Sequence, residues 1–273
     1  MIANKLKMKW ADNKATLNGW LSINSSFVAE IMAAQGYDSL TVDMQHGAIG
    51  YEGMLSMLQA MRASGVTPMV RVPWNQPADI MKALDAGAYG IICPMINTKE
   101  QAEEFVKCLR YPPRGERSFG PTRVNFSAGP GYASEANDQV IGLAMIETAE
   151  AVKNISAIVS TPGLDGVYIG PADLSLGVTN GRLAPGFDRE EPEMVETIKK
   201  ILTEAKTLGL RAGIHCGSSA YAVRAINWGF DFTTISNDVR VLVSGASKMV
   251  TETRGLLEGT DLNVKSEAEK SGY

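Results

Sequence analysis

The apolar residues of this chain gather in short runs that alternate with longer segments of mixed polarity. Runs rich in aliphatic and β-branched residues, bounded by glycine, proline or polar clusters, are typical of buried strands. Such runs occupy residues 19–23, 39–44, 67–72, 89–94, 140–146, 164–169, 211–215 and 231–235.

Between these runs, apolar residues return every three or four positions, which is the spacing of an amphipathic helix. Met54, Leu58 and Met61 follow this spacing before Gly65 ends the pattern. Another segment begins at Thr98 with a capping-box pattern. The predicted helices are 27–35, 51–64, 77–86, 98–109, 149–160, 192–208, 218–228 and one from 239 onward.

Eight strands, each followed by a helical pattern, predict an α/β fold of the (β/α)8 TIM-barrel type, which typically needs about 250 residues. We expect one domain over residues 1–257 and a polar tail over 258–273. A doubly wound open sheet is the alternative fold. It is less favoured because no Gly-x-Gly-x-x-Gly motif follows the first strand.

Residues 111–138 interrupt the alternation of strands and helices. This segment is rich in glycine, proline and charged residues and has no clear period. Long irregular segments inside compact domains usually serve a function or a subunit contact. We therefore expect the insert at the rim of the functional site or at an oligomer contact.

Composition excludes several classes of partner. No stretch approaches the roughly 20 apolar residues that a bilayer span needs. The N-terminal residues lack a signal-peptide core, so we expect a cytoplasmic protein with no membrane partner. The net charge of −4 comes from 26 basic and 30 acidic residues without a basic stripe, which argues against a nucleic-acid partner. The three cysteines are far apart and are interpreted as buried free thiols.

Several predicted strands end in ionisable side chains. Asp43 and His46 come at the end of the second strand, Arg71 ends the third, Glu147 follows the fifth and Asp173 follows the sixth. In a (β/α)8 barrel the C-terminal ends of all strands share one rim. We therefore expect these side chains to converge there.

Glu147 and Asp173 would bring two carboxylates together from adjacent strands. Two hard oxygen ligands with room for water suit Mg²⁺ or Mn²⁺, which keeps positions open for a bidentate substrate such as a 2-oxo acid. The alternative is that each acid caps the helix that follows it or pairs with a surface base.

His46 is one of two histidines in the chain. A neutral imidazole at a strand end can remove a proton next to a carbonyl, and Asp43 could orient it. The alternative is that the carboxylate holds the histidine for structural reasons. His215 also ends a strand, but the residues around it offer no carboxylate partner, so we expect it only to line the pocket.

Arg71 leaves an apolar strand and could stabilise an enolate oxygen or a substrate carboxylate. Alternatively, it could form an ion pair with Asp43 or Asp85. A Schiff-base aldolase would need a lysine at the site, yet no lysine ends a predicted strand. The sequence thus favours metal-assisted enolisation over imine chemistry.

With these residues assembled, the chain resembles the HpcH/HpaI aldolases, a family of metal-dependent class II pyruvate aldolases that includes 4-hydroxy-2-oxoheptanedioate aldolase. The resemblance runs from Gly19 to Ser247. Each motif alone is weak, but their order and spacing together are specific. The motifs are Val42-Asp-Met-Gln-His46, Val70-Arg-Val-Pro73, Leu84-Asp-Ala-Gly-Ala88, Tyr111-Pro-Pro-Arg-Gly115, Ile146-Glu-Thr148 and Ile169-Gly-Pro-Ala-Asp-Leu174.

The resemblance implies a barrel whose eighth helix is exchanged between protomers of a homo-oligomer, usually a hexamer built as a trimer of dimers. It implies that Glu147 and Asp173 bind a divalent metal (Mg²⁺, Mn²⁺ or Co²⁺) that pyruvate chelates, with no organic cofactor. His46 would take or return the proton, acting on or through a water on that metal. Asp43 and Asp85 would raise its basicity.

The resemblance also implies how the substrate is held. Arg71 would steady the enolate, and backbone donors near Ala172 and Asp173 would bind the pyruvate carboxylate. Trp20 would form a wall of the pocket. Phe119, on the insert, would reach the aldehyde site of a neighbouring protomer.

Two positions depart from the family pattern. Gln45 stands where many relatives have glutamate, which changes the hydrogen bonding or charge near the water shell of the metal. Met145 stands where some relatives have glutamine, which removes a polar contact to the substrate. Both departures concern the aldehyde or hydroxy-acid partner rather than the enolate chemistry.

The implied activity is reversible cleavage of a 4-hydroxy-2-oxo acid to pyruvate and an aldehyde. One alternative is a lyase for citryl- or malyl-type acyl-CoA substrates, which would need a basic groove for the CoA phosphates. Only one group of side chains offers such a groove: Arg110, Arg114, Arg117 and Arg123. The other alternative is a barrel that binds a 2-oxo acid without turnover.

Overall fold

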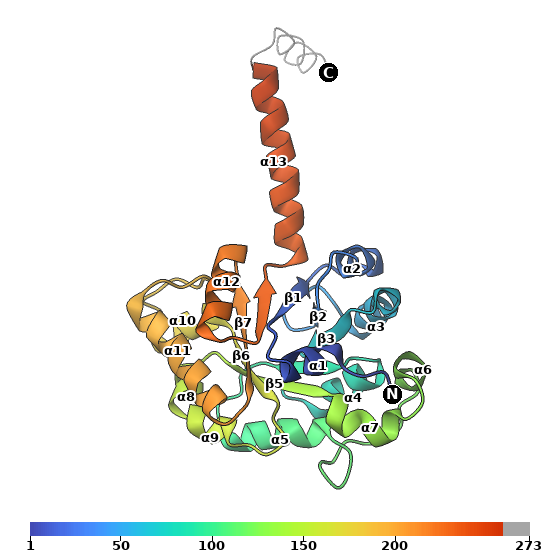
Figure 1. Ribbon diagram of the computed structural model, residues 1–273. Helices are drawn as coiled ribbons and strands as arrows, with labels where there is room; N and C mark the ends of the chain where they lie inside the picture. Colours follow the sequence, from blue (N-terminus) through green and yellow to red (C-terminus); the bar gives the residue numbers. More distant parts are fainter. Residues whose placement is uncertain (259–273) are drawn as a thin grey trace.

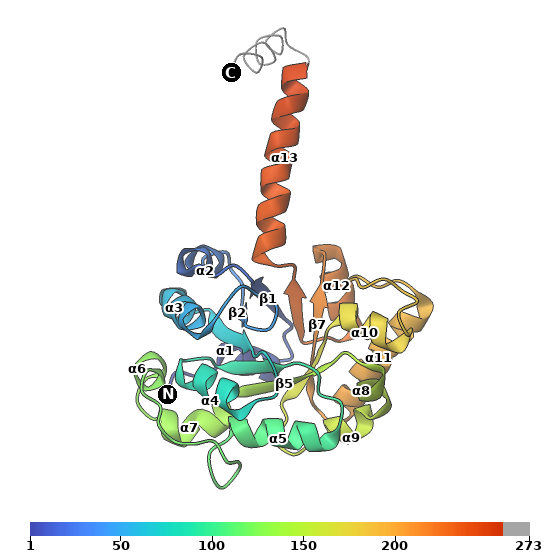
Figure 2. The same ribbon diagram turned by 180° about the vertical axis from the view of Figure 1, so that it is seen from behind.

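The computed structural model describes residues 1–258 (Figures 1 and 2). Eight parallel strands close into a barrel in sequence order, and β1 pairs with both β2 and β8. The predicted (β/α)8 barrel is therefore confirmed, and the open-sheet alternative is wrong. Of the predicted polar tail, all but residue 258 lies outside the described residues.

Every strand overlaps a run that the hydrophobic pattern predicted. Most strand positions are buried, because helices cover one side of the sheet and side chains fill the other. The strands are β1 (Thr16–Leu21), β2 (Ser39–Asp43), β3 (Thr67–Arg71), β4 (Gly90–Cys93), β5 (Ile141–Ile146), β6 (Gly166–Ile169), β7 (Arg211–Cys216) and β8 (Phe232–Ile235).

The predicted helices are present, with one break: the predicted helix 149–160 is divided at Asn154. A further helix that was not predicted, α10 (Pro171–Val178), follows β6 directly. The others are α2 (Ser26–Ala33), α3 (Tyr51–Met61), α4 (Pro77–Asp85), α5 (Lys99–Leu109), α8 (Ala149–Lys153), α9 (Ile155–Val159), α11 (Pro192–Thr207) and α12 (Ser219–Trp228). A short 3-10 turn, η1 (Arg62–Ser64), extends α3.

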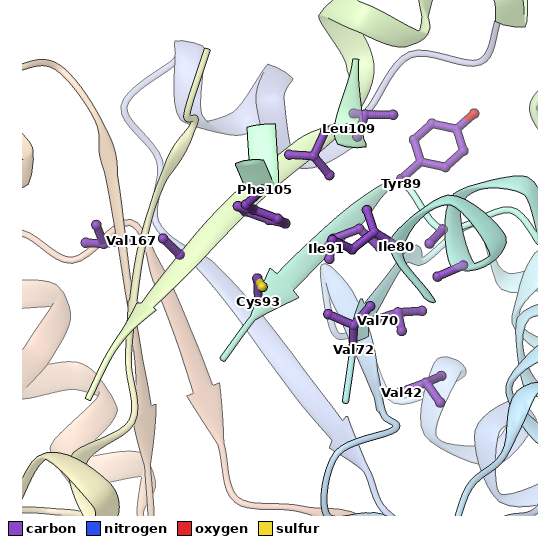
Figure 3. Close-up of a cluster of buried hydrophobic side chains, with 14 of the residues drawn as sticks. Val42, Val70, Val72, Ile80, Tyr89, Ile91, Cys93, Phe105, Leu109 and Val167 are labelled. Atoms are coloured by element: carbon purple, nitrogen blue, oxygen red, sulfur yellow. The ribbon is translucent and has the colours of Figure 1, made fainter. Parts of the chain in front are cut away.

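Side chains along each strand alternate between two apolar cores, as the pleat of a strand requires. In β5, Leu143 and Met145 belong to the cluster inside the barrel, and Ile146 belongs to the layer between strands and helices. Figure 3 shows part of this outer layer, with Ile80 of α4 and Phe105 of α5 among the strand side chains. The two cores hold the strand ends rigidly, which is what a precise site needs.

A short helix that was not predicted closes the N-terminal end of the barrel. α1 (Lys5–Ala11) buries Leu6 and Trp10, and the rings of Trp10 and Phe232 lie 5.9 Å apart edge to face. The Trp10 Nε1–H donates to Thr16 Oγ1 at 3.0 Å. A ligand is therefore expected to enter from the C-terminal end of the strands.

The insert 111–138 lies on the N-terminal side of the barrel, and the expectation that it borders the site is wrong within one chain. It joins α5 to β5, and connections from a helix back to a strand lie at the N-terminal ends of barrel strands. It is also less irregular than expected, because it contains α6 (Val124–Ala128) and most of α7 (Tyr132–Gln139). An oligomer contact through this segment remains a prediction.

The last helix, α13 (Asp238–Glu258), projects away from the barrel (Figure 1). Among its described residues only Asp238 is buried, and its carboxylate accepts the backbone N–H groups of Ser22 and Ile23, just after β1, at 2.9 and 3.0 Å. Large apolar side chains such as Leu242 and Met249 are exposed along it. Within residues 1–258, no helix combines the length and apolar character of a membrane span.

Candidate active site

A cavity lies at the C-terminal ends of the strands. Its lining includes the five ionisable residues predicted to converge, namely Asp43, His46, Arg71, Glu147 and Asp173. The predicted wall residue Trp20 and the predicted backbone donor Ala172 line it as well. The structure thus brings most of the predicted site together on one rim.

Asp43 and Arg71 form a buried ion pair in this cavity. They are partners in the register of β2 and β3. The Arg71 Nε–H donates to Asp43 Oδ1 at 2.8 Å, and Nη2 donates to Oδ2 at 2.6 Å. Burial alone would raise the pKa of Asp43, but the bonds and charge of Arg71 hold that pKa below its usual value. The predicted pairing of Arg71 with an aspartate is therefore confirmed for Asp43.

Asp43 also shapes the loop that carries His46. Its Oδ1 accepts backbone N–H bonds from Gln45 at 3.1 Å and from His46 at 3.3 Å. The imidazole of His46 makes no hydrogen bond within residues 1–258 and lies exposed at the cavity. Asp43 therefore positions the backbone of His46 and makes no hydrogen bond to its ring, which differs from the simple pairing considered from the sequence.

Glu147 is a second buried acid of the cavity, with 2% of its surface exposed. Its Oε1 accepts the Met95 N–H at 2.8 Å. Burial and the negative charge of Asp173 raise the pKa of Glu147 to about 7, against the opposing effects of the Met95 bond and Arg71. A β-carbon at Gly170 would lie 2.6 Å from Glu147 Oε2, so the absent side chain leaves room for this carboxylate.

Asp173 approaches the cavity from the first turn of α10, and its side chain is exposed. The helix begins after Gly170 with Pro171 at its first position, where the missing N–H costs no hydrogen bond. Backbone N–H groups in a first helical turn have no acceptor within the helix. Ala172 and Asp173 can thus offer donors to an anionic group, as the sequence resemblance implied.

The donor set fits a hard divalent cation. Besides Asp43, which is paired with Arg71, the carboxylates of Glu147 and Asp173 line the cavity. Burial and the negative charge of Asp173 both raise the pKa of Glu147, and a bound cation would favour its charged form. Within residues 1–258, no group of three or more His, Cys, Asp or Glu side chains gathers as a metal site. If Glu147 and Asp173 hold a cation, they supply two oxygen ligands and leave the other positions to water or substrate.

Asp85 lies away from this cavity, and its predicted support of His46 is wrong within one chain. It is the last residue of α4, which starts at the C-terminal rim and runs antiparallel to the strands. Its Oδ1 accepts a hydrogen bond from Arg117 Nη2 at 2.6 Å instead. Arg117 is itself buried and contacts the Tyr132 hydroxyl at 2.9 Å.

Two other predicted residues do not line the cavity either. The side-chain oxygen of Gln45 is buried and has no hydrogen-bond partner within residues 1–258. Phe119 is 65% exposed and packs on Tyr111, with ring centroids 5.4 Å apart. A role for Phe119 in a neighbouring protomer stays a prediction.

The four arginines considered for a CoA groove are engaged elsewhere, and none lines the cavity. Arg110 and Arg114 pair with Asp165 and Asp138, each at 2.5 Å. Arg117 pairs with Asp85, and Arg123 donates to the Ala86 carbonyl oxygen. The structure therefore offers no support for the acyl-CoA alternative.

Some cavity residues were missed by sequence reasoning. Tyr168 faces the barrel interior from β6, which the alternation of that strand could have indicated. Phe187 belongs to the loop between α10 and α11, and no periodicity marks it. His215 lines the cavity as expected. No lysine lines it in the described part of the chain, which agrees with the argument against imine chemistry.

Comparisons with known proteins agree with this arrangement. The model of the HpcH/HpaI aldolase/citrate lyase family matches residues 17–244. The chain is 44% identical over 253 residues to the hydroxypyruvate/pyruvate aldolase of Rhizorhabdus wittichii, covering 93% of this chain and 100% of that one. It is 32% identical over 251 residues to the 4-hydroxy-2-oxo-heptane-1,7-dioate aldolase of Escherichia coli, covering 91% and 94%.

A solved structure of a family member has the same fold. The crystal structure of a HpcH/HpaI aldolase/citrate lyase family protein from Burkholderia cenocepacia matches with a TM-score of 0.84 and 31% identity, covering 92% of this chain and 99% of that chain. The fold and the rim define a (β/α)8 enzyme with an acidic pair, a histidine and an arginine at one cavity. The chain belongs to the HpcH/HpaI aldolase/citrate lyase family.

Proposed function

We propose that this protein is a divalent-metal-dependent aldolase that reversibly cleaves a 4-hydroxy-2-oxo acid to pyruvate and an aldehyde. The observation that carries the proposal is the meeting of Glu147, Asp173, His46 and Arg71 around one cavity. Relatives that cover nearly the whole chain are named aldolases, which supports the reaction class. The identity of the 2-oxo acid as pyruvate follows the family resemblance.

Glu147 and Asp173 would hold Mg²⁺, Mn²⁺ or Co²⁺ in this proposal. When bound, the cation would act as a Lewis acid that polarises the 2-oxo group and its carboxylate. The backbone N–H groups of Ala172 and Asp173, in the first turn of α10, would add donors to that carboxylate. Met145, in place of a polar residue, would leave one side of the cavity apolar.

His46 would move the proton. In the cleavage direction, His46 would take the proton of the C4 hydroxyl group, and the C3–C4 bond would then break. The aldehyde leaves, and the electron pair of the C3–C4 bond stays with C3 to form the pyruvate enolate. Return of a proton to C3 gives the methyl group of pyruvate. The exposed imidazole, which is not tied to a carboxylate in the described chain, is free to reach the reacting atoms.

Arg71 would stabilise the enolate that forms when this bond breaks. Its Nε and Nη2 groups are committed to Asp43, and its Nη1 makes no hydrogen bond within residues 1–258. The guanidinium also lies over the Trp20 ring, 4.8 Å from its centroid. A cation held this rigidly can oppose developing negative charge without reorganising during the reaction.

We also infer a homo-oligomer in which α13 packs on a neighbouring protomer. The support is the exposed apolar side of this helix, with Leu242 and Val250 among its exposed residues. Large exposed apolar patches usually mark interaction surfaces. This proposal includes the hexameric state, a trimer of dimers, that the family resemblance implies.

The test is exchange of the pyruvate methyl protons with deuterated water, followed by NMR, because this step needs the enolate and no aldehyde. The wild-type enzyme with Mg²⁺, Mn²⁺ or Co²⁺ is expected to catalyse exchange, and EDTA is expected to stop it. His46→Ala should lower the rate by about 10²- to 10⁴-fold, the usual contribution of a general acid–base residue.

Two outcomes would contradict the proposal. Absence of exchange with all three metals would favour a barrel that binds a 2-oxo acid without turnover. Turnover that survives EDTA but is lost on treatment with borohydride would point to a lysine imine.

A further inference from the structure

One buried polar atom of the cavity has no partner. His215 is 7% exposed and lines the cavity, and its Nε2 makes no hydrogen bond within residues 1–258. The other buried, unpartnered side-chain atoms of the described chain belong to residues outside the cavity lining. Buried polar groups in proteins are almost always hydrogen-bonded, so this atom is arranged to meet something that enters the cavity.

A chain of hydrogen bonds inside the barrel sets which nitrogen of His215 carries the proton. Asn18 Nδ2 donates to Thr234 Oγ1 at 2.9 Å, and Thr234 Oγ1 lies 2.6 Å from the Tyr168 hydroxyl. The Tyr168 hydroxyl lies 3.2 Å from His215 Nδ1. Within residues 1–258, the Tyr168 hydroxyl oxygen is the one acceptor that the buried Thr234 hydroxyl meets, so Thr234 donates to Tyr168 and Tyr168 then donates to Nδ1. The Nε2 atom therefore carries the hydrogen and is a donor.

The imidazole ring is also held in one orientation. Phe187 stacks on it with ring centroids 4.5 Å apart, and Trp20 meets it edge to face at 5.0 Å. The loop that carries Phe187 is fixed in turn, because Asp188 Oδ1 accepts the Gly217 N–H at 2.7 Å. A donor fixed this firmly can select a substrate by the position of a single oxygen.

His215 is a neutral donor. Burial lowers the pKa of His215 to about 3, and the nearby positive charge of Arg71 acts in the same direction against the opposing charge of Asp43. A neutral N–H between two aromatic rings suits an uncharged oxygen better than a carboxylate, which gains more from a charged partner. A hydroxyl oxygen meets this description.

We propose that His215 is a specificity-determining residue whose Nε2–H donates a hydrogen bond to a hydroxyl oxygen of the substrate, and that Tyr168 is the positioning residue that fixes this donor. The inference rests on the aldolase function proposed above. It means that the enzyme favours reactants that carry a hydroxyl group over analogues in which a methyl group replaces it, since such an analogue leaves the buried Nε2–H unpaired.

The hydroxyl could belong to the aldehyde or to the 2-oxo acid, and two pairs of equal-sized probes separate these sources. In the first arm, pyruvate is combined with glycolaldehyde or with propionaldehyde. In the second arm, propionaldehyde is combined with hydroxypyruvate or with 2-oxobutanoate. Within each pair one member has a hydroxyl where the other has a methyl group, and the readout is the ratio of their kcat/KM values with the Mn²⁺-loaded enzyme.

His215→Phe is expected to lower this ratio by about 10- to 100-fold in one of the two arms, the effect of one lost hydrogen bond to a buried donor. His215→Gln, whose side-chain amide can place an N–H near the position of Nε2, should retain most of the ratio. Tyr168→Phe removes the group that fixes the tautomer, so it should also lower the ratio. The arm in which the ratio falls identifies the reactant that carries the hydroxyl.

A purely structural role of His215 would lower kcat/KM for both members of each pair and leave the ratios unchanged, which would overturn the proposal. Equal ratios for the wild type and for His215→Phe in both arms would do the same. Failure of the aldolase function is recognised separately, because the wild type would then show no exchange of pyruvate methyl protons.

Discussion

Glu147→Gln is expected to lower the rate of pyruvate proton exchange by about 10³-fold or more, because a neutral amide cannot replace a charged ligand of a Lewis-acid metal. The fold should remain intact. The amide oxygen of the variant would still accept the Met95 N–H, and the substitution removes a carboxylate whose raised pKa reflects the cost of burying its charge. The melting temperature of the metal-free variant should therefore equal or exceed that of the wild type.

Asp173→Asn should reduce exchange to a similar extent, since the proposed cation needs both carboxylates. The matched control for Glu147→Gln is Glu150→Gln, which replaces the same residue type on an exposed side chain of α8. It should exchange pyruvate protons at the wild-type rate. If Glu147→Gln exchanged pyruvate protons within a few-fold of the wild-type rate, Glu147 would not be a ligand of a catalytic metal.

Arg71→Ala is expected to have the second large effect, and it should damage both stability and activity. The substitution leaves the Asp43 carboxylate buried without its ion-pair partner, which typically costs about 3–5 kcal/mol of folding free energy. It also frees the loop that carries His46, because the same carboxylate binds the His46 backbone N–H. Chemical denaturation should show the loss of stability, and exchange by the folded fraction should fall by about 10²-fold or more.

Arg110→Ala separates these two effects. Arg110 is 2% exposed and pairs with Asp165 at 2.5 Å, at the other end of the barrel. Its removal should cost a similar free energy of unfolding while the folded fraction keeps its exchange activity. If Arg110→Ala and Arg71→Ala lose activity in equal proportion, the role of Arg71 is structural alone.

Much of the fold could be predicted because each barrel unit repeats the same signals. Buried strands such as β5 are continuous apolar runs, and helices such as α5 carry a capping box and an apolar stripe. The elements that were missed lack these signals. α1 buries only Leu6 and Trp10, too few positions to establish a period.

The candidate site could be predicted where a residue directly ends a strand. Arg71 and Glu147 met this condition, and the rim geometry of a barrel brought them together. Asp85 does not end a strand. It is the last residue of helix α4, and the direction of that helix places Asp85 at the opposite end of the barrel. Asp173 was placed at a strand end but lies in the first turn of α10, since Gly170 and Pro171 begin a helix there.

The donor role of His215 could not be predicted from its neighbours in the sequence. Its ring is fixed by Tyr168 from the adjacent strand and by Phe187 from a loop, and neither contact leaves a local pattern. Contacts between segments distant in the chain depend on the register of the closed barrel. Only the three-dimensional structure supplies that register.

In the proposed enzyme, Glu147 and Asp173 share one divalent cation at this cavity. The most direct measurement is titration of the metal-free protein with Mn²⁺, followed by electron paramagnetic resonance of the free ion. We expect one Mn²⁺ per chain for the wild type, displaced by Mg²⁺, and no binding in this range for the folded double variant Glu147→Gln/Asp173→Asn. Binding of Mn²⁺ by the double variant with wild-type stoichiometry and affinity would show that these two carboxylates do not hold the metal.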